Sequence, residues 1–273
     1  ISPTDPIAVL ATFKKYKANK NIRVIIAGES LFNDGVGIVV FFTLFQLTFN
    51  AIPITALSIS KLFCQQTLGG LAYGIVIGLI AQKIISESKD YLIAILVTLS
   101  ITTAGYSLAM SLGISGPLAM VVSGIFLSNY AKKGTQEAKV NHMLDTFWEI
   151  IDEVLNTVLF LLLGLELITL HLDWNDALAS IIAIPVALFS RYVSIALPLQ
   201  FLKSNTVKQK DLRRILTWGG LRGGLAVALA LSLPETTSTA AFRNIIICMT
   251  FSIVTFSIIV QGSTIGKLIP KKP

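Results

Sequence analysis

The chain has 273 residues, of which 53% are hydrophobic and 14% are charged, and its formal net charge is +7. An ordinary soluble domain has about a quarter of its residues charged. The composition therefore excludes a typical soluble enzyme or binding domain and predicts a membrane protein.

Apolar runs follow one another along the whole chain, and a bilayer core needs about 20 apolar residues per helix. We expect crossings near residues 22–50, 62–82, 91–112, 147–169, 177–202, 212–233 and 243–264, with a shorter run at 115–130 and a half-length run at 1–13. This pattern predicts an all-α polytopic membrane protein with eight crossings and a partial segment at the start. No linker rich in Pro, Ser or Gly divides it, so one transmembrane domain over 1–273 is expected. Because the chain opens on "ISPTDPIAVL" without a Met, we expect it to be the C-terminal portion of a longer polypeptide.

The positive charges alternate from loop to loop. If each run crosses once, nearly all Lys and Arg residues lie in the loop at 14–23 and in every second loop after it. The opposite side has only Lys61 and Arg243, and Arg191 and Arg222 fall inside spans. By the positive-inside rule this distribution predicts a cytoplasmic C-terminus. The basic excess therefore indicates membrane orientation and not a nucleic-acid partner.

Two groups of helix-breaking residues lie within apolar segments instead of at turns. One is "SPTDPIA" at 2–8. The other is "WGGLRGGLAV" at 218–227, where Gly220 and Gly223 flank Leu221 and Arg222. Interrupted backbone is tolerated at membrane depth only where protein or a water-filled cavity satisfies it. Interrupted helices are also the best sequence indication of a substrate site in secondary transporters.

The stretch "IAGESLFNDGVGIVVFF" at 26–42 places polar side chains deep in the first full span. Glu29 and Asn33 are four residues apart on one helical face, and Ser30 and Asp34 share the adjacent face. An ionised acid at the bilayer centre costs about 2.5–3.5 kcal/mol even on lenient scales. Such an acid is retained only if it is paired, solvated by a cavity or used in function.

Glu29 suits a structural ion pair, because an arginine in the membrane cannot lose its charge and needs a partner. Arg191 in "LFSRYVSIAL" is the preferred partner and Arg222 is the alternative.

Asp34 has only the neutral Asn33 beside it, which does not neutralise its charge. A buried carboxylate of this kind binds either a proton or a small cation, and this competition predicts cation/proton exchange. Asp5 lies between two prolines that force extended backbone, so Thr4 and Asp5 offer a hydroxyl, carbonyls and a second carboxylate. Hard cations favour such oxygen ligands, although "TDP" by itself is also a common turn.

Other acids have weaker claims. Glu149, Asp152 and Glu153 begin the span at 147–169 near the expected cytoplasmic face. They form either an acidic funnel that concentrates cations or simply a solvated helix end, which we favour.

Six sequence blocks resemble one known family. "SPTDPIAVLATF", "GESLFNDGVGIVVF", "LNTVLFLLLGLEL", "SRYVSI", "GGLRGGLAVALALSLP" and "VQGSTI" are similar, in this order, to the NhaP/NHE-type monovalent cation:proton antiporters. The resemblance implies thirteen transmembrane helices in two inverted repeats, of which this chain supplies about nine, with discontinuous crossing helices at "TDP" and "GGLRGG". It also implies a homodimer in which a core domain moves against a dimerisation domain.

Carried over from this resemblance, Asp34 is the ion- and proton-binding carboxylate, with Asn33 beside it and with Asp5, Thr4 and Ser30 completing the cation site. The Glu29–Arg191 pair also agrees with the family pattern. The resemblance implies sodium/proton antiport by alternating access, one cation for one proton, with no cofactor. The sequence does not separate sodium from potassium or lithium. An intramembrane aspartyl protease using Asp5 and Asp34 is the alternative from another class, but "FNDGVG" has its glycines after the aspartate and not before it.

Overall fold

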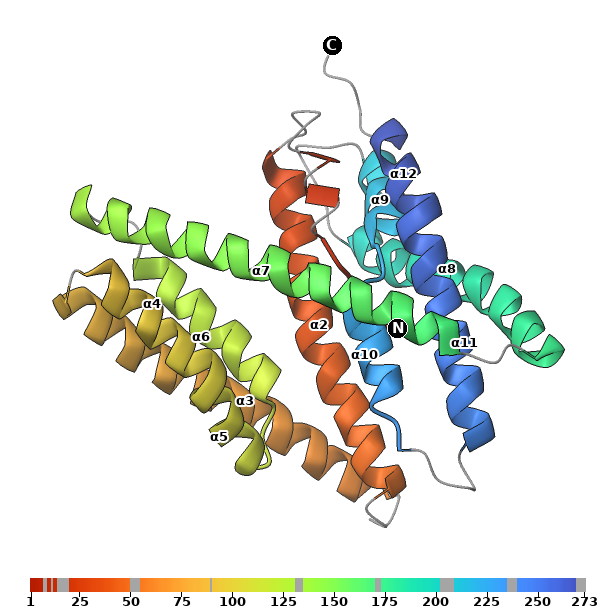
Figure 1. Cartoon of the computed structure of the whole chain (residues 1–273), viewed down its shortest axis with the longest axis horizontal. Helices are drawn as coiled ribbons and strands as arrows, with labels where there is room; N and C mark the ends of the chain where they lie inside the picture. The colour runs from red at the N-terminus through yellow and green to blue at the C-terminus, as the bar shows by residue number, and fades with distance from the viewer. Residues whose placement is uncertain are drawn as a thin grey trace. The chain divides into compact units, whose positions relative to one another are not determined.

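The computed structural model describes residues 1–6, 9–10, 12–13, 20–49, 55–88, 90–130, 135–169, 173–201, 209–234 and 240–268. Every regular element in these ranges is a helix, so the all-α prediction is confirmed (Figure 1). The chain divides into two compact units. Unit 1 comprises residues 1–34 and 158–273, and unit 2 comprises residues 35–157.

The lengths of the helices agree with the membrane assignment. Among the described residues, five helical stretches are long and apolar enough to cross a bilayer: 21–49, 56–88, 91–111, 176–201 and 242–268. The predicted run at 147–169 belongs to a longer helix, α7 (Thr135–Thr169). The predicted run at 212–233 is divided into α9 (Gln209–Gly219) and α10 (Gly224–Leu231). Many large apolar side chains on these helices are exposed, as lipid-facing surfaces require.

Unit 2 is built on close contact between α3 (Ala56–Ser88) and α6 (Gly116–Tyr130), which lie side by side in Figure 1. Gly70, Gly74 and Gly78 line the contact face of α3, and a Cβ atom at Gly74 would lie 2.5 Å from the carbonyl oxygen of Ala119 on α6. These small residues at every fourth position therefore allow the two helices to approach closely.

The third component of unit 2 is α4 (Tyr91–Ser100), which continues through a π-helical stretch, Ile101–Gly105, into α5 (Tyr106–Ser111). The hydroxyl of Tyr73 on α3 donates a hydrogen bond of 2.9 Å to the carbonyl of Gly105, where the π-helical stretch ends. This bond fixes the irregular turn of the helix against α3.

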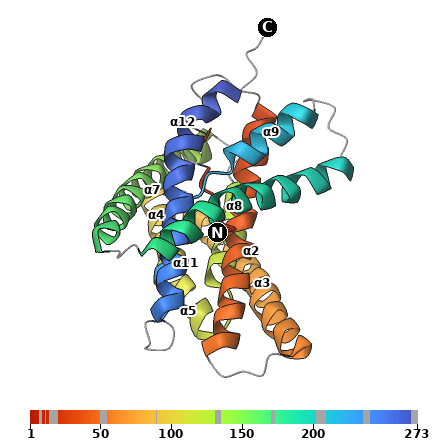
Figure 2. The same cartoon turned by 90° about the vertical axis from the view of Figure 1, so that its right-hand side faces the viewer.

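Unit 1 contains the first half of α2 (Lys20–Phe49), the end of α7 from residue 158, and the helices that follow α7 in the chain. Helix α8 (Trp174–Phe201) crosses α11 (Ala240–Phe256), as Figure 2 shows. Helix α11 continues without interruption through a π-helical stretch, Ser257–Gln261, into α12 (Gly262–Thr264) and a final 3₁₀ turn. The short helices α9 and α10 are separated by the non-helical residues 220–223.

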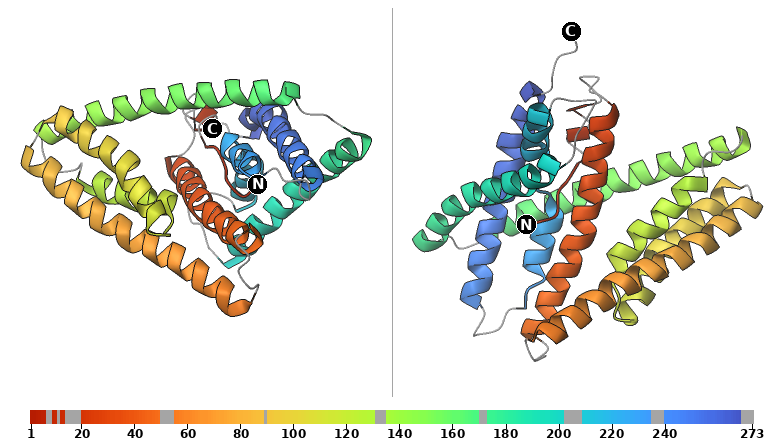
Figure 3. Two further views of the ribbon diagram at one scale, coloured as in Figure 1. Left: turned by 60° about the horizontal axis from the view of Figure 1, so that its bottom comes forward. Right: turned by 180° about the vertical axis from the view of Figure 1, so that it is seen from behind.

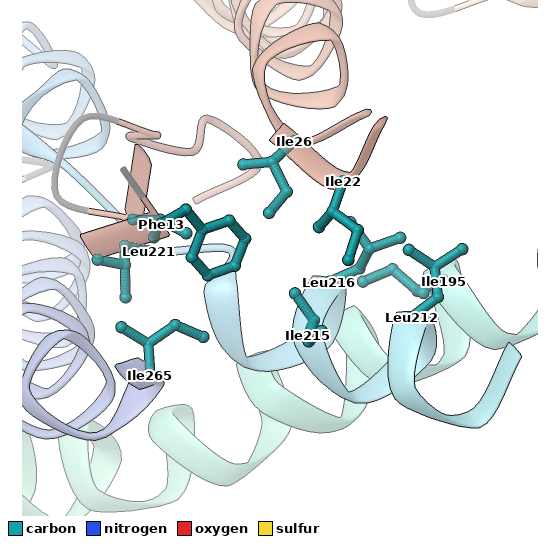
Figure 4. Close-up of a cluster of buried hydrophobic side chains, with 10 residues drawn as sticks. Phe13, Ile22, Ile26, Ile195, Leu212, Ile215, Leu216, Leu221 and Ile265 are labelled. Atoms are coloured by element: carbon teal, nitrogen blue, oxygen red, sulfur yellow. The ribbon is translucent and has the colours of Figure 1, made fainter. Parts of the chain in front are cut away.

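The core of unit 1 joins the N-terminal segment to α2, α8, α9 and the end of the last helix. Its buried apolar side chains, shown in Figure 4, are those of Val9, Phe13, Ile22, Ile26, Ile195, Leu212, Ile215, Leu216, Leu221 and Ile265. Because Leu221 belongs to the break between α9 and α10, this core holds the broken segment in place from one side. The predicted membrane orientation rests on basic residues in the loops. Many of them, those within 14–19, 131–134, 202–208 and 269–273, lie outside the described residues.

Candidate functional site: the crossing of two non-helical segments

Two non-helical segments of unit 1 cross at the site. Residues 1–6 run in an extended conformation beside residues 220–223, as Figure 3 shows. The backbone N–H of Asp5 donates a hydrogen bond of 2.7 Å to the carbonyl of Leu221. At Gly223 the two chains approach so closely that a Cβ atom would lie 2.6 Å from the Cβ of Asp5. The two groups of helix breakers found in the sequence therefore lie against each other.

Asp34 and Ser30 of α2 both bind the backbone of Thr4 at this crossing. The N–H of Thr4 donates to Oδ1 of Asp34 at 2.9 Å, and the Ser30 hydroxyl donates to the Thr4 carbonyl. Thr4 and Ser30 are buried, with 5% and 3% of their surface exposed. The Thr4 hydroxyl itself is buried and has no hydrogen-bond partner within the part of the chain that the structure describes. Because Ser30 and Asp34 are one helical turn apart, a single extended residue engages both.

Glu29, one residue before Ser30, lies in an ion pair with Arg191 of α8. Its two carboxylate oxygens are 2.5 and 2.7 Å from guanidinium nitrogens of Arg191, which is 7% exposed. Asn33 donates to the same carboxylate at 2.6 Å. Of the two partners considered from the sequence, the structure thus pairs Glu29 with Arg191. Asn33 bonds Glu29 here, so its predicted place at the cation site stays a prediction.

The guanidinium of Arg191 also reaches the break between α9 and α10. It donates to the carbonyl of Leu216, near the end of α9, at 3.1 Å. A Cβ atom at Gly220 would overlap the guanidinium group. Gly220 therefore leaves the space through which the arginine passes, and a side chain there would displace it.

Arg222 holds the two crossing segments together. Its guanidinium donates to the carbonyls of Ser2 at 2.6 Å and Pro3 at 3.3 Å. Its backbone N–H donates to the Ser257 hydroxyl at 2.8 Å, and Ser257 in turn donates to Gln261 at 2.7 Å. Arg222 therefore has carbonyl oxygens as acceptors instead of Glu29.

Sequence reasoning did not identify Ser257 and Gln261. Their only signal is the spacing of four between two polar residues in the mainly apolar stretch "FSIVTFSIIVQ". Ser257 is fully buried and Gln261 is 3% exposed. The amide of Gln261 also donates to the carbonyl of Trp218 in the last turn of α9, at 3.2 Å. The pair therefore ties the end of α9 and the break at Arg222 to the last helix.

A cavity of about 720 Å³ adjoins this network within unit 1. Its polar lining comes from Ser2, Asn33, Ser190, Arg191, Ser194 and Arg222, and the remainder is apolar surface of α8 and α11. The cavity therefore brings space for water or a small ion beside the charged side chains.

The acids predicted as an entry funnel belong to unit 2. Glu149, Asp152 and Glu153 are exposed residues of α7 in unit 2, where Asp152 accepts a hydrogen bond from Asn156 at 3.1 Å. Their role as a funnel stays a prediction. Among the described residues no three His, Cys, Asp or Glu side chains gather in a group suited to a metal ion.

The chain resembles known proteins over nearly its whole length. The profile of a family described as "Sodium/hydrogen exchanger, transmembrane" matches residues 1–271. The chain belongs to this family. The resemblance inferred from the sequence blocks is thereby confirmed, and the protein is a multi-pass membrane protein of a transporter family.

Several named antiporters are similar to this chain. The Na(+)/H(+) antiporter NhaP of Pseudomonas aeruginosa is 37% identical over 273 residues, a match that covers 98% of this chain and 63% of the relative. The Na(+)/H(+) antiporter NhaH of Halobacillus dabanensis is 33% identical, with 99% of this chain and 66% of the relative covered. The low-affinity Na(+)/H(+) antiporter NhaS1 of Synechocystis is 34% identical, with 97% and 50% covered. The chain thus spans less than two thirds of the length of these relatives.

The fold also matches a solved structure. The sodium proton antiporter MjNhaP1 from Methanocaldococcus jannaschii at pH 8 superposes with a TM-score of 0.78 at 18% sequence identity, covering 97% of this chain and 67% of that one. The expected antiporter fold with discontinuous crossing segments is therefore confirmed.

Proposed function

We propose that the complete polypeptide encoded by the gene exchanges sodium for protons across a membrane, with Asp34 as the carboxylate that binds either ion. The observation that carries this proposal is the contrast between two acids of one helix. Glu29 forms an ion pair with Arg191. No Lys or Arg of the described residues lies within ion-pair distance of Asp34, which accepts the backbone N–H of Thr4 instead. Asp34 therefore keeps a negative charge that a mobile cation can balance.

The surrounding oxygens suit a small hard cation. The Thr4 hydroxyl is buried without a partner in the described part of the chain. Ser30 uses its hydrogen on the Thr4 carbonyl, which leaves its oxygen lone pairs available. With a carboxylate oxygen of Asp34, and with Asp5 on the same extended segment, these atoms form an oxygen-rich set of the kind that hard cations prefer. Asn33 is assigned to this site as a neighbour that holds Glu29 in place.

The exchange follows from competition for a single charge. One sodium ion or one proton neutralises Asp34, and the other ion is then released, so the stoichiometry is one for one. In this proposal the segment at 1–6 and the break at 220–223 carry the site between two access states, and the ion gradients set the direction. No cofactor takes part, and the protein acts as a homodimer with its C-terminus in the cytoplasm.

The names of the relatives support sodium as the transported cation, since the relatives reported above are called Na(+)/H(+) antiporters. Potassium or lithium would use the same oxygen ligands. The aspartyl protease alternative is not favoured, because the chain belongs to an exchanger family.

Everted membrane vesicles containing the complete protein test the proposal. Asp34→Asn is compared with wild type and with Asp173→Asn, which changes an exposed aspartate of the same unit. Sodium, potassium or lithium is added in turn, and the collapse of a preformed pH gradient is followed. We expect wild type and Asp173→Asn to dissipate the gradient with sodium, and Asp34→Asn to leave it intact. Equal exchange by Asp34→Asn would show that the carboxylate is structural.

A further inference from the structure

A second pocket of unit 1, about 540 Å³ in volume, lies between α8, α9 and the end of the last helix. Its rim carries four cationic side chains: Lys210, Arg213 and Arg214 from the first half of α9, and Lys267 from the final turn. None of the four belongs to the network around Asp34.

These cations are not neutralised by the protein around them. Among the described residues, no carboxylate forms an ion pair with any of the four. Asp211 lies between two of them in the sequence but makes no such pair, and Arg213 stacks over the ring of Tyr192 on α8, with its guanidinium carbon 5.5 Å from the ring centroid. The pocket therefore presents a concentrated positive charge.

The remaining lining of the pocket includes apolar and aromatic side chains. Trp218 lies eight residues after Lys210 on α9, which corresponds to about 12 Å along a helix. Its indole N–H donates to the Thr264 hydroxyl at 2.8 Å, and Leu268 lines the wall nearby. The Thr217 hydroxyl beside it is buried with no hydrogen-bond partner in the described part of the chain. The pocket thus combines four cationic side chains with apolar and aromatic lining.

The helices that contribute to the pocket also carry exposed apolar side chains, as lipid-facing helices do. On α8 the side chains of Leu197 and Phe201 are 54% and 86% exposed, and on the last helix Ile259 is 63% exposed. Helix α9 is amphipathic, because Leu212, Ile215 and Leu216 are buried on the face opposite its cations. A soluble anion would use the charged rim but would leave the apolar lining uncovered.

We propose that this pocket binds an acidic phospholipid of the surrounding membrane. The phosphate lies against Lys210, Arg213, Arg214 and Lys267, and an acyl chain lies along Trp218 and Leu268. Basic pockets between membrane helices are a recognised way of binding acidic lipid headgroups. The bound lipid connects α8, α9 and the end of the last helix, all of which also contribute to the network around Arg191 and Arg222.

The test uses the complete protein, purified in detergent and depleted of lipid. Dioleoyl phosphatidylglycerol, dioleoyl phosphatidylcholine and inorganic phosphate are titrated in turn, and the bound fraction is read by native mass spectrometry. We expect saturable binding of phosphatidylglycerol, weak binding of phosphatidylcholine and no displacement of the lipid by phosphate. Arg213→Gln and Lys267→Gln should each weaken phosphatidylglycerol binding about fivefold, and the double variant about 25-fold.

Matched variants separate this site from general charge and from transport. Arg23→Gln removes an exposed arginine of α2 that does not line the pocket, and it should bind phosphatidylglycerol as wild type does. Asp34→Asn should also bind it normally, so that loss of antiport and loss of lipid binding are distinguishable. Melting temperatures measured without lipid report whether each variant folds.

Three results would overturn the proposal. The first is equal affinity for the two phospholipids, and the second is unchanged phosphatidylglycerol binding in the folded double variant. The third is displacement of the lipid by inorganic phosphate, which would make the pocket a site for soluble anions.

Discussion

Removing either partner of the Glu29–Arg191 pair should destabilise the protein strongly, whereas removing both should cost little more than removing one. Arg191→Gln takes away both contacts to the Glu29 carboxylate, at 2.5 and 2.7 Å, and leaves that acid with Asn33 alone. Glu29→Gln removes the negative charge and leaves the guanidinium, which is 7% exposed, with neutral acceptors only, the new amide oxygen and the Leu216 carbonyl at 3.1 Å. Breaking a buried ion pair from one side costs about 3–5 kcal/mol because the remaining charge is uncompensated.

Glu29 is 26% exposed, so we take the lower end of this range, about 3 kcal/mol for each single variant. The double variant Glu29→Gln/Arg191→Gln leaves two neutral amides and should also lose about 3 kcal/mol, because no unpaired charge remains. The coupling energy is then about 3 kcal/mol.

Thermal unfolding in detergent, followed by tryptophan fluorescence, measures these differences. A loss of about 3 kcal/mol corresponds to a melting temperature lower by roughly 6–12 °C for a domain of this size. The reasoning fails if the stability losses of the two single variants add in the double variant. It also fails if Arg191→Gln has the melting temperature of wild type.

Three further substitutions probe the site and the helix contacts. Thr4→Val keeps the shape of the side chain and removes its unpartnered hydroxyl, so the sodium concentration for half-maximal exchange should rise about tenfold in the vesicle assay. An unchanged concentration would exclude the Thr4 hydroxyl oxygen as a ligand. Gly223→Ala places a methyl group 2.6 Å from the Cβ of Asp5, so exchange should be lost while the protein still elutes as a folded species; normal exchange would show that the crossing tolerates a wider spacing. Gly74→Val in unit 2 forces a side chain against the carbonyl of Ala119, and overpacking of this kind should lower stability by about 1–3 kcal/mol in the unfolding assay. A wild-type melting temperature for Gly74→Val would contradict the contact.

Hydropathy located most helices because twenty consecutive apolar residues have few other stable arrangements. It placed their ends less well: α3 extends over Ala56–Ser88 where the apolar run indicated 62–82, since polar residues at a helix end continue the same backbone hydrogen bonding. The π-helical stretches Ile101–Gly105 and Ser257–Gln261 have no compositional signature. The break at 220–223 was visible in the sequence only because glycines flank it.

At the site, electrostatics predicted more than geometry did. The cost of burying an arginine identified Arg191 and Arg222 as residues that need partners, with Arg191 preferred for Glu29 and Arg222 left as the alternative, and the structure pairs Glu29 with Arg191. The carbonyl acceptors of Arg222 were not foreseen, because every residue has a carbonyl and none is distinguished in the sequence. Contacts over 162 residues, such as that from Arg191 to Glu29, depend on the fold and not on local spacing.

The hydrogen bonds at the crossing explain why two interrupted backbones persist in a membrane protein. Each break frees N–H and C=O groups that hydrocarbon cannot satisfy. The carbonyl of Leu221 accepts from Asp5, and the N–H of Arg222 donates to Ser257. On the other segment of the crossing, residues 1–6, the carbonyl of Thr4 accepts a hydrogen bond from the Ser30 hydroxyl.

The backbone of the crossing is thus held by fixed partners, while the Thr4 hydroxyl, next to the N–H that holds Asp34, is buried without one in the described part of the chain. An unpartnered hydroxyl is costly to bury, so a cation bound at Asp34 would recover that cost. With a proton on Asp34, the Thr4 hydroxyl would instead donate its hydrogen bond to an oxygen of the carboxyl group. In the proposed exchange, these atoms accommodate either ion but not both, which is the competition that exchange requires.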